Sequence, residues 1–190
     1  MKDILLGAFH ITDFEGLDHI LFLVALAASF DLTKLGRMAL LATAFTIGHS
    51  LTLLLAGLDV VRSLIEYVEF LIPLTIVGTA VFQISGFNII NSTKVLRKSM
   101  YLFTLLFGLI HGLGFSSFYR ISSSQDSSFI IPLLKFNLGV EIGQLVILLV
   151  TLSLFSFGRA LGIHERSQQL VVGGATLSLA VIMAFENWPF

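Results

Sequence analysis

Histidine and carboxylate side chains are embedded in hydrophobic stretches of this chain. His19, His49 and His111 lie inside or at the edge of segments long enough to cross a bilayer, and Glu69 and Glu141 interrupt apolar segments of their own. An ionisable group in hydrocarbon costs roughly 2.5–3.5 kcal/mol on insertion scales, so such a group indicates function by default. Several imidazoles and carboxylates in one small membrane protein predict a metal or proton site.

Polar neighbours extend this set. Asp18 directly precedes a histidine and is expected to orient its imidazole. Asn137, Glu141 and Gln144 follow i, i+4, i+7 spacing, which places them on one face of a helix. The predicted metal-binding residues are three histidines and three carboxylates: His19, His49, His111, Asp18, Glu69 and Glu141. The secondary candidates are His10, Ser50, Asn137 and Gln144.

Composition restricts the class of protein and the chemistry of the site. Hydrophobic residues make up 56% of the chain and charged residues 12%, about half of the quarter that soluble domains carry. The net charge of −1 argues against nucleic-acid binding, which needs clustered lysine and arginine. Without cysteine there is no thiolate ligand, and a mixed set of imidazole and carboxylate groups suits Ni, Co or Zn.

The hydropathy pattern predicts an all-α, polytopic membrane protein with residues 1–190 in a single transmembrane domain. About 20 apolar residues span a hydrocarbon core of roughly 30 Å. Six segments meet this requirement: 14–31, 36–58, 64–87, 99–119, 132–157 and 169–186. The residues before His10 are too few to span, so we expect them to form an interfacial turn or helix. The many phenylalanines are expected to face lipid.

Basic residues predict the orientation of these segments. The first, third and fifth connections carry seven basic residues, and the N-terminus and the other connections carry four. The excess indicates that the odd connections are cytoplasmic and that both termini face outside. At a rise of about 1.5 Å per residue, Asp18–His19, His49, Glu69, His111 and Glu141 then fall at a similar depth, in the outer half of the bilayer.

Five groups of motifs occur in an order that resembles the HupE/UreJ family of membrane proteins. They occupy residues 10–23, 44–53, 68–73, 107–115 and 136–144, and they contain His10, Asp18-His19, Gly48-His49-Ser50, Glu69, His111-Gly112 and Asn137-Leu138-Gly139-Val140-Glu141. Members of that family associated with hydrogenase or urease maturation are regarded as nickel permeases or uptake accessories. The resemblance implies a divalent metal permease or uptake accessory in the cytoplasmic membrane of a bacterium.

Two other interpretations remain open at this point. A membrane-embedded zinc hydrolase would use the same histidine and carboxylate cluster, with a metal-bound water as nucleophile. The buried polar groups would alternatively pair with one another and only hold helices together. We favour a transporter over an enzyme. The expected partners are lipid and the metal ion, without nucleic acid, and a homo-oligomer is left open.

Overall fold

The computed structural model describes residues 1–14, 16–28, 30–61, 65–86, 94–123 and 129–190. Within these residues the chain is helical and has no strand. The helices are α1 (Lys2–Thr12), α2 (Leu17–Ala27), the short 3-10 helix η1 (Leu32–Lys34), α3 (Leu35–Gly57), α4 (Ile65–Ile84), α5 (Lys94–Ser123), α6 (Ile130–Ala160) and α7 (Glu165–Glu186). The predicted connections at 88–93 and 124–128 lie outside the described residues.

The long helices agree with the hydropathy prediction. Five helices, α3 to α7, are long and apolar enough to cross a membrane, and each coincides with one of the last five predicted segments. Large apolar side chains cover their outer faces, as expected for contact with lipid: Leu134, Leu149, Leu154 and Val171 are each at least half exposed. The fold is therefore that of a polytopic membrane protein.

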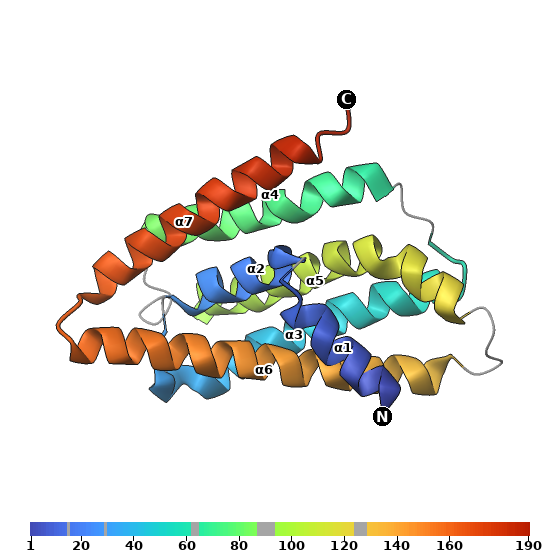
Figure 1. Ribbon diagram of the computed structural model, residues 1–190, viewed down its shortest axis with the longest axis horizontal. Helices are drawn as coiled ribbons and strands as arrows, with labels where there is room; N and C mark the ends of the chain where they lie inside the picture. Colours follow the sequence, from blue (N-terminus) through green and yellow to red (C-terminus); the bar gives the residue numbers. More distant parts are fainter. Residues whose placement is uncertain (15, 29, 62–64, 87–93, 124–128) are drawn as a thin grey trace.

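The first predicted segment, 14–31, differs from the structure. Its helix, α2, has 11 residues, which is about 16 Å at 1.5 Å per residue and too short to cross alone. The residues before it form another 11-residue helix, α1. Figure 1 shows that α1 runs obliquely from one end of the bundle toward its middle, and that α2 continues from the middle to the other end. The first crossing is therefore a broken helix, and the turn between its halves is at the surface, where Phe14 is 80% exposed.

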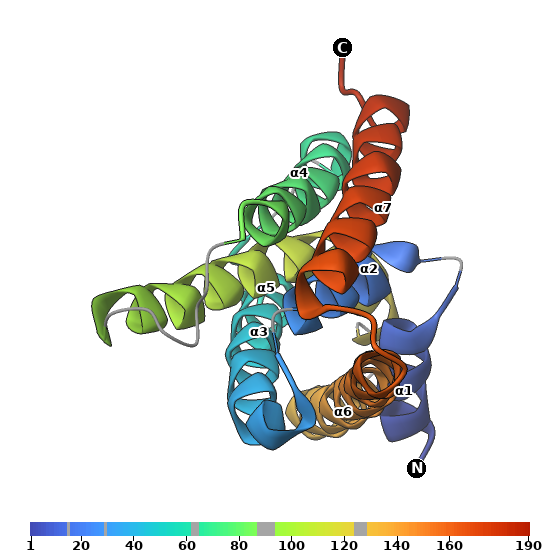
Figure 2. The ribbon, with the colours of Figure 1, turned by 90° about the vertical axis from the view of Figure 1, so that its left-hand side faces the viewer.

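The helices are arranged in three pairs around α2. The most extensive interfaces are α3 with α5, α1 with α6, and α4 with α7. Viewed end-on, α2 lies at the centre and the three pairs surround it (Figure 2). The connections alternate between the two ends of the bundle, and both chain termini lie toward the same end (Figure 1). This arrangement buries most of α2, including His19 in its polar first turn, although Leu17 at its start is exposed.

Glycine allows α3 and α5 to meet backbone to backbone. A Cβ atom on Gly48 would overlap the carbonyl oxygen of Leu105, and one on Gly108 would overlap that of Phe45. A Cβ on Gly112 would lie 2.7 Å from the carbonyl oxygen of His49. Small residues permit this close packing in membrane helices, where lipid leaves little hydrophobic drive between helices. The contact aligns the histidines of the two helices.

Glycine also allows α1 and α6 to approach each other closely. A Cβ on Gly7 would overlap the carbonyl oxygen of Phe136, and a Cβ on Gly139 would overlap that of Ile4. On Gly143 it would overlap the side chain of Ile11. Because α1 is too short to be held in place by spanning the bilayer, its position depends on this packing.

We predict that Gly139→Ala weakens the docking of α1. The new methyl group meets backbone that cannot move away by a side-chain rotation, and overpacking of this kind costs about 1–3 kcal/mol. Gly174→Ala is the matched control, because nothing lies within 4 Å of a Cβ at that position on α7. We expect a lower Tm in detergent for Gly139→Ala and an unchanged or higher Tm for Gly174→Ala. Equal Tm values would show that the close approach is dispensable.

Candidate metal site

The break in the first crossing brings two histidines together. His10 lies in the last turn of α1, and His19 lies in the first turn of α2. Their ring centroids are 4.9 Å apart. With His49 of α3 they form a group whose ligand atoms all lie within 4.8 Å of one another. This spacing is compatible with one ion that contacts all three imidazoles after a small side-chain movement. His10, a secondary candidate in the sequence, is thus one of the three.

The nitrogen atoms of this group are buried without hydrogen bonds. His49 is fully buried, and neither of its ring nitrogens has a hydrogen-bond partner among the described residues. The same holds for Nε2 of His10 and Nε2 of His19. A buried polar group without a partner costs roughly 1–3 kcal/mol. Several such atoms facing one another are expected where a ligand completes the site.

His111 of α5 stands beside this group. Its ring centroid is 5.2 Å from that of His19, and its side chain is 2% exposed. Its Nδ1 lies 2.8 Å from the carbonyl oxygen of Phe107. A carbonyl only accepts, so Nδ1 carries the proton and donates, which leaves the Nε2 lone pair available. Nε2 has no partner among the described residues. A backbone carbonyl often fixes a metal-binding tautomer in this way.

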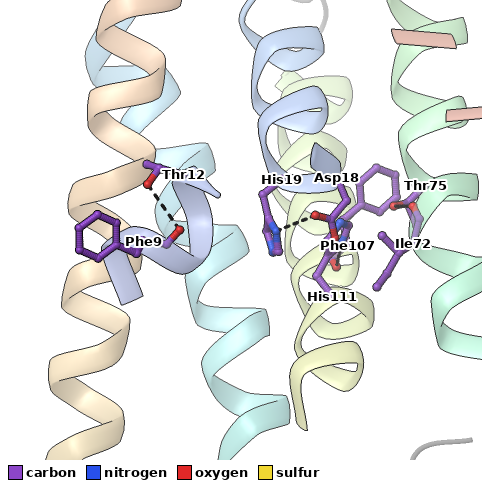
Figure 3. Close-up of polar contacts among 8 residues, drawn as sticks. All are labelled: Phe9, Thr12, Asp18, His19, Ile72, Thr75, Phe107 and His111. Atoms are coloured by element: carbon purple, nitrogen blue, oxygen red, sulfur yellow. Dashed lines mark hydrogen bonds and ion pairs between the residues drawn. The ribbon is translucent and has the colours of Figure 1, made fainter. Parts of the chain in front are cut away.

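Asp18 places a carboxylate beside the histidines. Its Oδ1 is 3.0 Å from Nδ1 of His19, within ion-pair distance but without the alignment of a hydrogen bond. The dashed line between the two side chains in Figure 3 marks this ion pair. The side chain of His111 lies on the other side of the Asp18 carboxylate (Figure 3). A carboxylate beside one ring nitrogen favours the proton on that nitrogen and leaves the other as a ligand. His19 therefore presents Nε2 to the group.

The two half-helices add their dipoles to the site. The C-terminal end of α1 carries partial negative charge and lies beside the histidines, which favours a cation. The N-terminal end of α2 carries partial positive charge, and Asp18 in its first turn offsets that charge. Broken helices at membrane depth are tolerated where they are buried in protein or line a cavity, and transporters use their ends to hold ions.

Glu141 lies in a separate polar contact between α3 and α6. Thr43 donates a hydrogen bond of 2.6 Å to its Oε1, and Thr46 donates one of 2.8 Å to Oε1 of Gln144. Among the described residues, the group formed by His10, His19 and His49 contains no carboxylate. Glu141 and Gln144 are thus neighbours on one face of α6, as their spacing predicted. They are hydrogen-bonded to threonines of α3 and are not part of the histidine group.

The remaining sequence candidates are more dispersed. Glu69 is exposed on α4. Ser50 donates to the carbonyl oxygen of Thr46 at 2.6 Å, so its hydroxyl is engaged within its own helix. Asn137 is 8% exposed, and its Oδ1 has no partner among the described residues. The structure therefore concentrates imidazoles at one place and distributes the other polar groups around it.

Sequence reasoning missed the aromatic surroundings of the histidines. Phe22, Phe45 and Phe136 are at most 2% exposed and contact the imidazoles, so the expectation that phenylalanines face lipid is wrong for them. Phe45 lies four residues before His49, and Phe22 lies three residues after His19. This spacing on a helix places each pair on one face, and it was a signal that could have identified these residues.

Comparisons with known proteins agree with this architecture. A protein-family model described as HupE / UreJ protein matches residues 1–188. No curated protein and no solved structure matches the chain.

We predict that His49→Leu separates the stability of the fold from its ability to bind metal. Leucine fills this buried position with an apolar side chain and removes two buried nitrogens without partners, so the metal-free protein should unfold at the same or a higher temperature. Excess Ni2+ should raise the Tm of the original protein, because a ligand at 100 times its Kd stabilises by about 2.7 kcal/mol. The variant should lose that rise.

The control for this experiment is His164→Gln, at an exposed position before α7. It should keep the Tm rise with Ni2+. A lower Tm of metal-free His49→Leu together with a preserved rise would contradict the assignment and identify His49 as a packing residue.

Proposed function

The chain belongs to the HupE/UreJ family, and from this premise we propose that it is a permease or uptake accessory for a divalent transition metal of the nickel or cobalt type. The family is associated with nickel or cobalt uptake. The ion is the transported substrate, and the histidine group is the site that binds it transiently as it crosses the membrane.

One observation carries the proposal. Ligand atoms of His10, His19 and His49 lie within 4.8 Å of one another, on three different helices, and Nε2 of each is buried without a hydrogen-bond partner among the described residues. His111 supplies a fourth imidazole beside them. A group that only held helices together would pair its donors with acceptors, whereas this group presents several lone pairs to a common space.

The ligand chemistry selects the class of ion. Neutral imidazole suits Ni, Co and Zn, whereas Ca2+ and Mg2+ require mainly oxygen ligands. Thiolates are absent because the chain has no cysteine, and a set without thiolates releases its ion more readily. In this proposal Asp18 orients His19, while Glu69 and Glu141 attract the cation along its route, away from the imidazoles.

Uptake into proteoliposomes tests this function directly. We expect Ni2+ or Co2+ to enter vesicles that contain the protein and carry a metal-sensitive dye inside. Asp18→Asn should lower metal affinity by roughly 10–100-fold, the usual loss for an outer-shell partner, and His19→Gln should lower it further. Glu141→Gln can still accept the hydrogen bond from Thr43 and should slow uptake while the protein stays folded.

His164→Gln is again the control and should transport normally. Normal uptake by folded His19→Gln would contradict the proposal. Tight Zn2+ binding without uptake, together with a hydrolytic activity that His19→Gln abolishes, would establish a membrane-embedded zinc hydrolase instead.

The proposed location is the bacterial cytoplasmic membrane, with both termini outside. The basic residues of the odd connections support this orientation. We therefore expect Ser85→Cys, at an exposed position after α4, to react with an impermeant thiol reagent from the cytoplasmic side only. Val60→Cys, 67% exposed at the opposite end, should react only from outside. The cysteine-free chain makes both signals specific, and the reverse pattern would invert the orientation.

A further inference from the structure

Phenylalanine rings close the histidine group toward one end of the bundle. Phe22, Phe45 and Phe107 form this layer, which we call the inner layer. The centroids of Phe22 and Phe45 are 5.4 Å apart, and those of Phe22 and Phe107 are 5.6 Å apart. Phe45 also lies 5.2 Å from the ring of His111 and 6.0 Å from that of His49. The inner layer thus packs directly against the imidazoles.

A second pair of rings closes the opposite side. Phe115 and Phe136, the outer layer, stack with centroids 5.4 Å apart and planes within 9°. The ring of His10 lies 4.1 Å from that of Phe115 and 5.7 Å from that of Phe136. His49 lies 6.3 Å from Phe136, almost parallel to it. The outer layer therefore covers the histidine group through α5 and α6.

The directions of the helices place the two layers on opposite sides. Helices α3 and α5 run toward the end where the even connections lie (Figure 1). Phe45 and Phe107 each precede a histidine by four residues on these helices, whereas Phe115 follows His111 by four. Four residues correspond to about 6 Å along a helix. The imidazoles therefore occupy a level between the two sets of rings.

We infer that the two layers are the two barriers of an alternating-access route, and that the structure is closed at both. This inference rests on the proposed transport function. Flat, apolar rings in contact leave no polar group to replace the water around a cation, so an ion crosses a layer only after its rings separate. Only one layer can open at a time without forming a continuous leak.

The helix pairs indicate how the outer layer opens. Phe115 belongs to α5, and Phe136 belongs to α6, to which α1 is fixed through Gly7 and Gly139. A movement of the α1–α6 pair away from the α3–α5 pair separates the stacked rings. The same movement withdraws His10 from His49, so opening the outer layer also loosens one ligand. The inner layer spans α2, α3 and α5 and is not disturbed by this movement.

A single cysteine placed between the layers tests the inference without metal. His49→Cys puts a thiol at a fully buried position that contacts a ring of each layer in the original protein. In sealed vesicles it should react slowly with an impermeant thiol reagent added to either face. Adding Phe115→Ala should increase labelling from the face with the even connections by about tenfold or more, in proportion to the open population. Adding Phe45→Ala should do the same from the opposite face.

Phe157→Ala is the matched control, because that phenylalanine is on α6 but 63% exposed, and it should change neither rate. If Phe45→Ala fails to fold, Phe45→Leu replaces it and should give a smaller increase from the same face. Unchanged labelling in both layer variants, or equal increases from both faces, would overturn the inference.

The thiol measurement and the uptake measurement fail independently. Absent uptake with sided labelling would refute transport and retain the barriers. Uptake without any sided effect of the layer variants would refute the barriers alone.

Discussion

The broken first crossing is the constraint on which the site depends. A continuous helix places residues on one face only at spacings of three or four, and it satisfies its own backbone groups. By ending α1 at Thr12 and starting α2 at Leu17, the chain turns two helix ends and two histidines toward the same space. Neither half can span the membrane, so each is held by packing: α1 by the glycines of α6, and α2 by the three surrounding pairs. The close helix contacts are therefore requirements of the site as well as of the fold.

The electrostatics of the site follow from that burial. The carboxylate of Asp18 lies beside the imidazoles and forms an ion pair with His19. Thr43 and Thr46 of α3 are hydrogen-bonded to Glu141 and Gln144 instead of to the imidazoles. A buried set of imidazoles with few hydrogen-bond partners makes a fold less stable than an apolar core of the same shape would be. A bound cation would offset this loss of stability, so the free energy of unfolding would depend on whether the site is occupied.

Sequence patterns predicted the long helices, and they selected His19 and His49, which the structure groups with His10, for physical reasons. Long apolar segments report spanning helices whatever their partners are, so α3 to α7 were predictable. The helix before His10 agrees with the turn or helix expected there, whereas the shortness of α2 was not predicted. Hydropathy also carries no information on how α1 packs against α6. His10 was only a secondary candidate for a similar reason, because its position relative to His19 depends on the turn between α1 and α2. The separation of Glu141 from the imidazoles depends on which threonine of α3 faces it, and hydropathy carries no information about this.

The distribution of ligands among packing units favours a carrier over a rigid enzyme site. His10 is attached to the α1–α6 pair, His49 and His111 to the α3–α5 pair, and His19 to the central α2. Each pair is tightly fixed through backbone contacts at glycine, whereas contacts between pairs are less extensive. A catalytic metal needs ligands whose positions stay fixed through many turnovers, which is best achieved within one rigid unit. A transported ion must be bound and then released, and a site divided between units is dismantled by their relative movement without unfolding any helix. The same division that makes the site difficult to recognise in the sequence gives it a physical route to open.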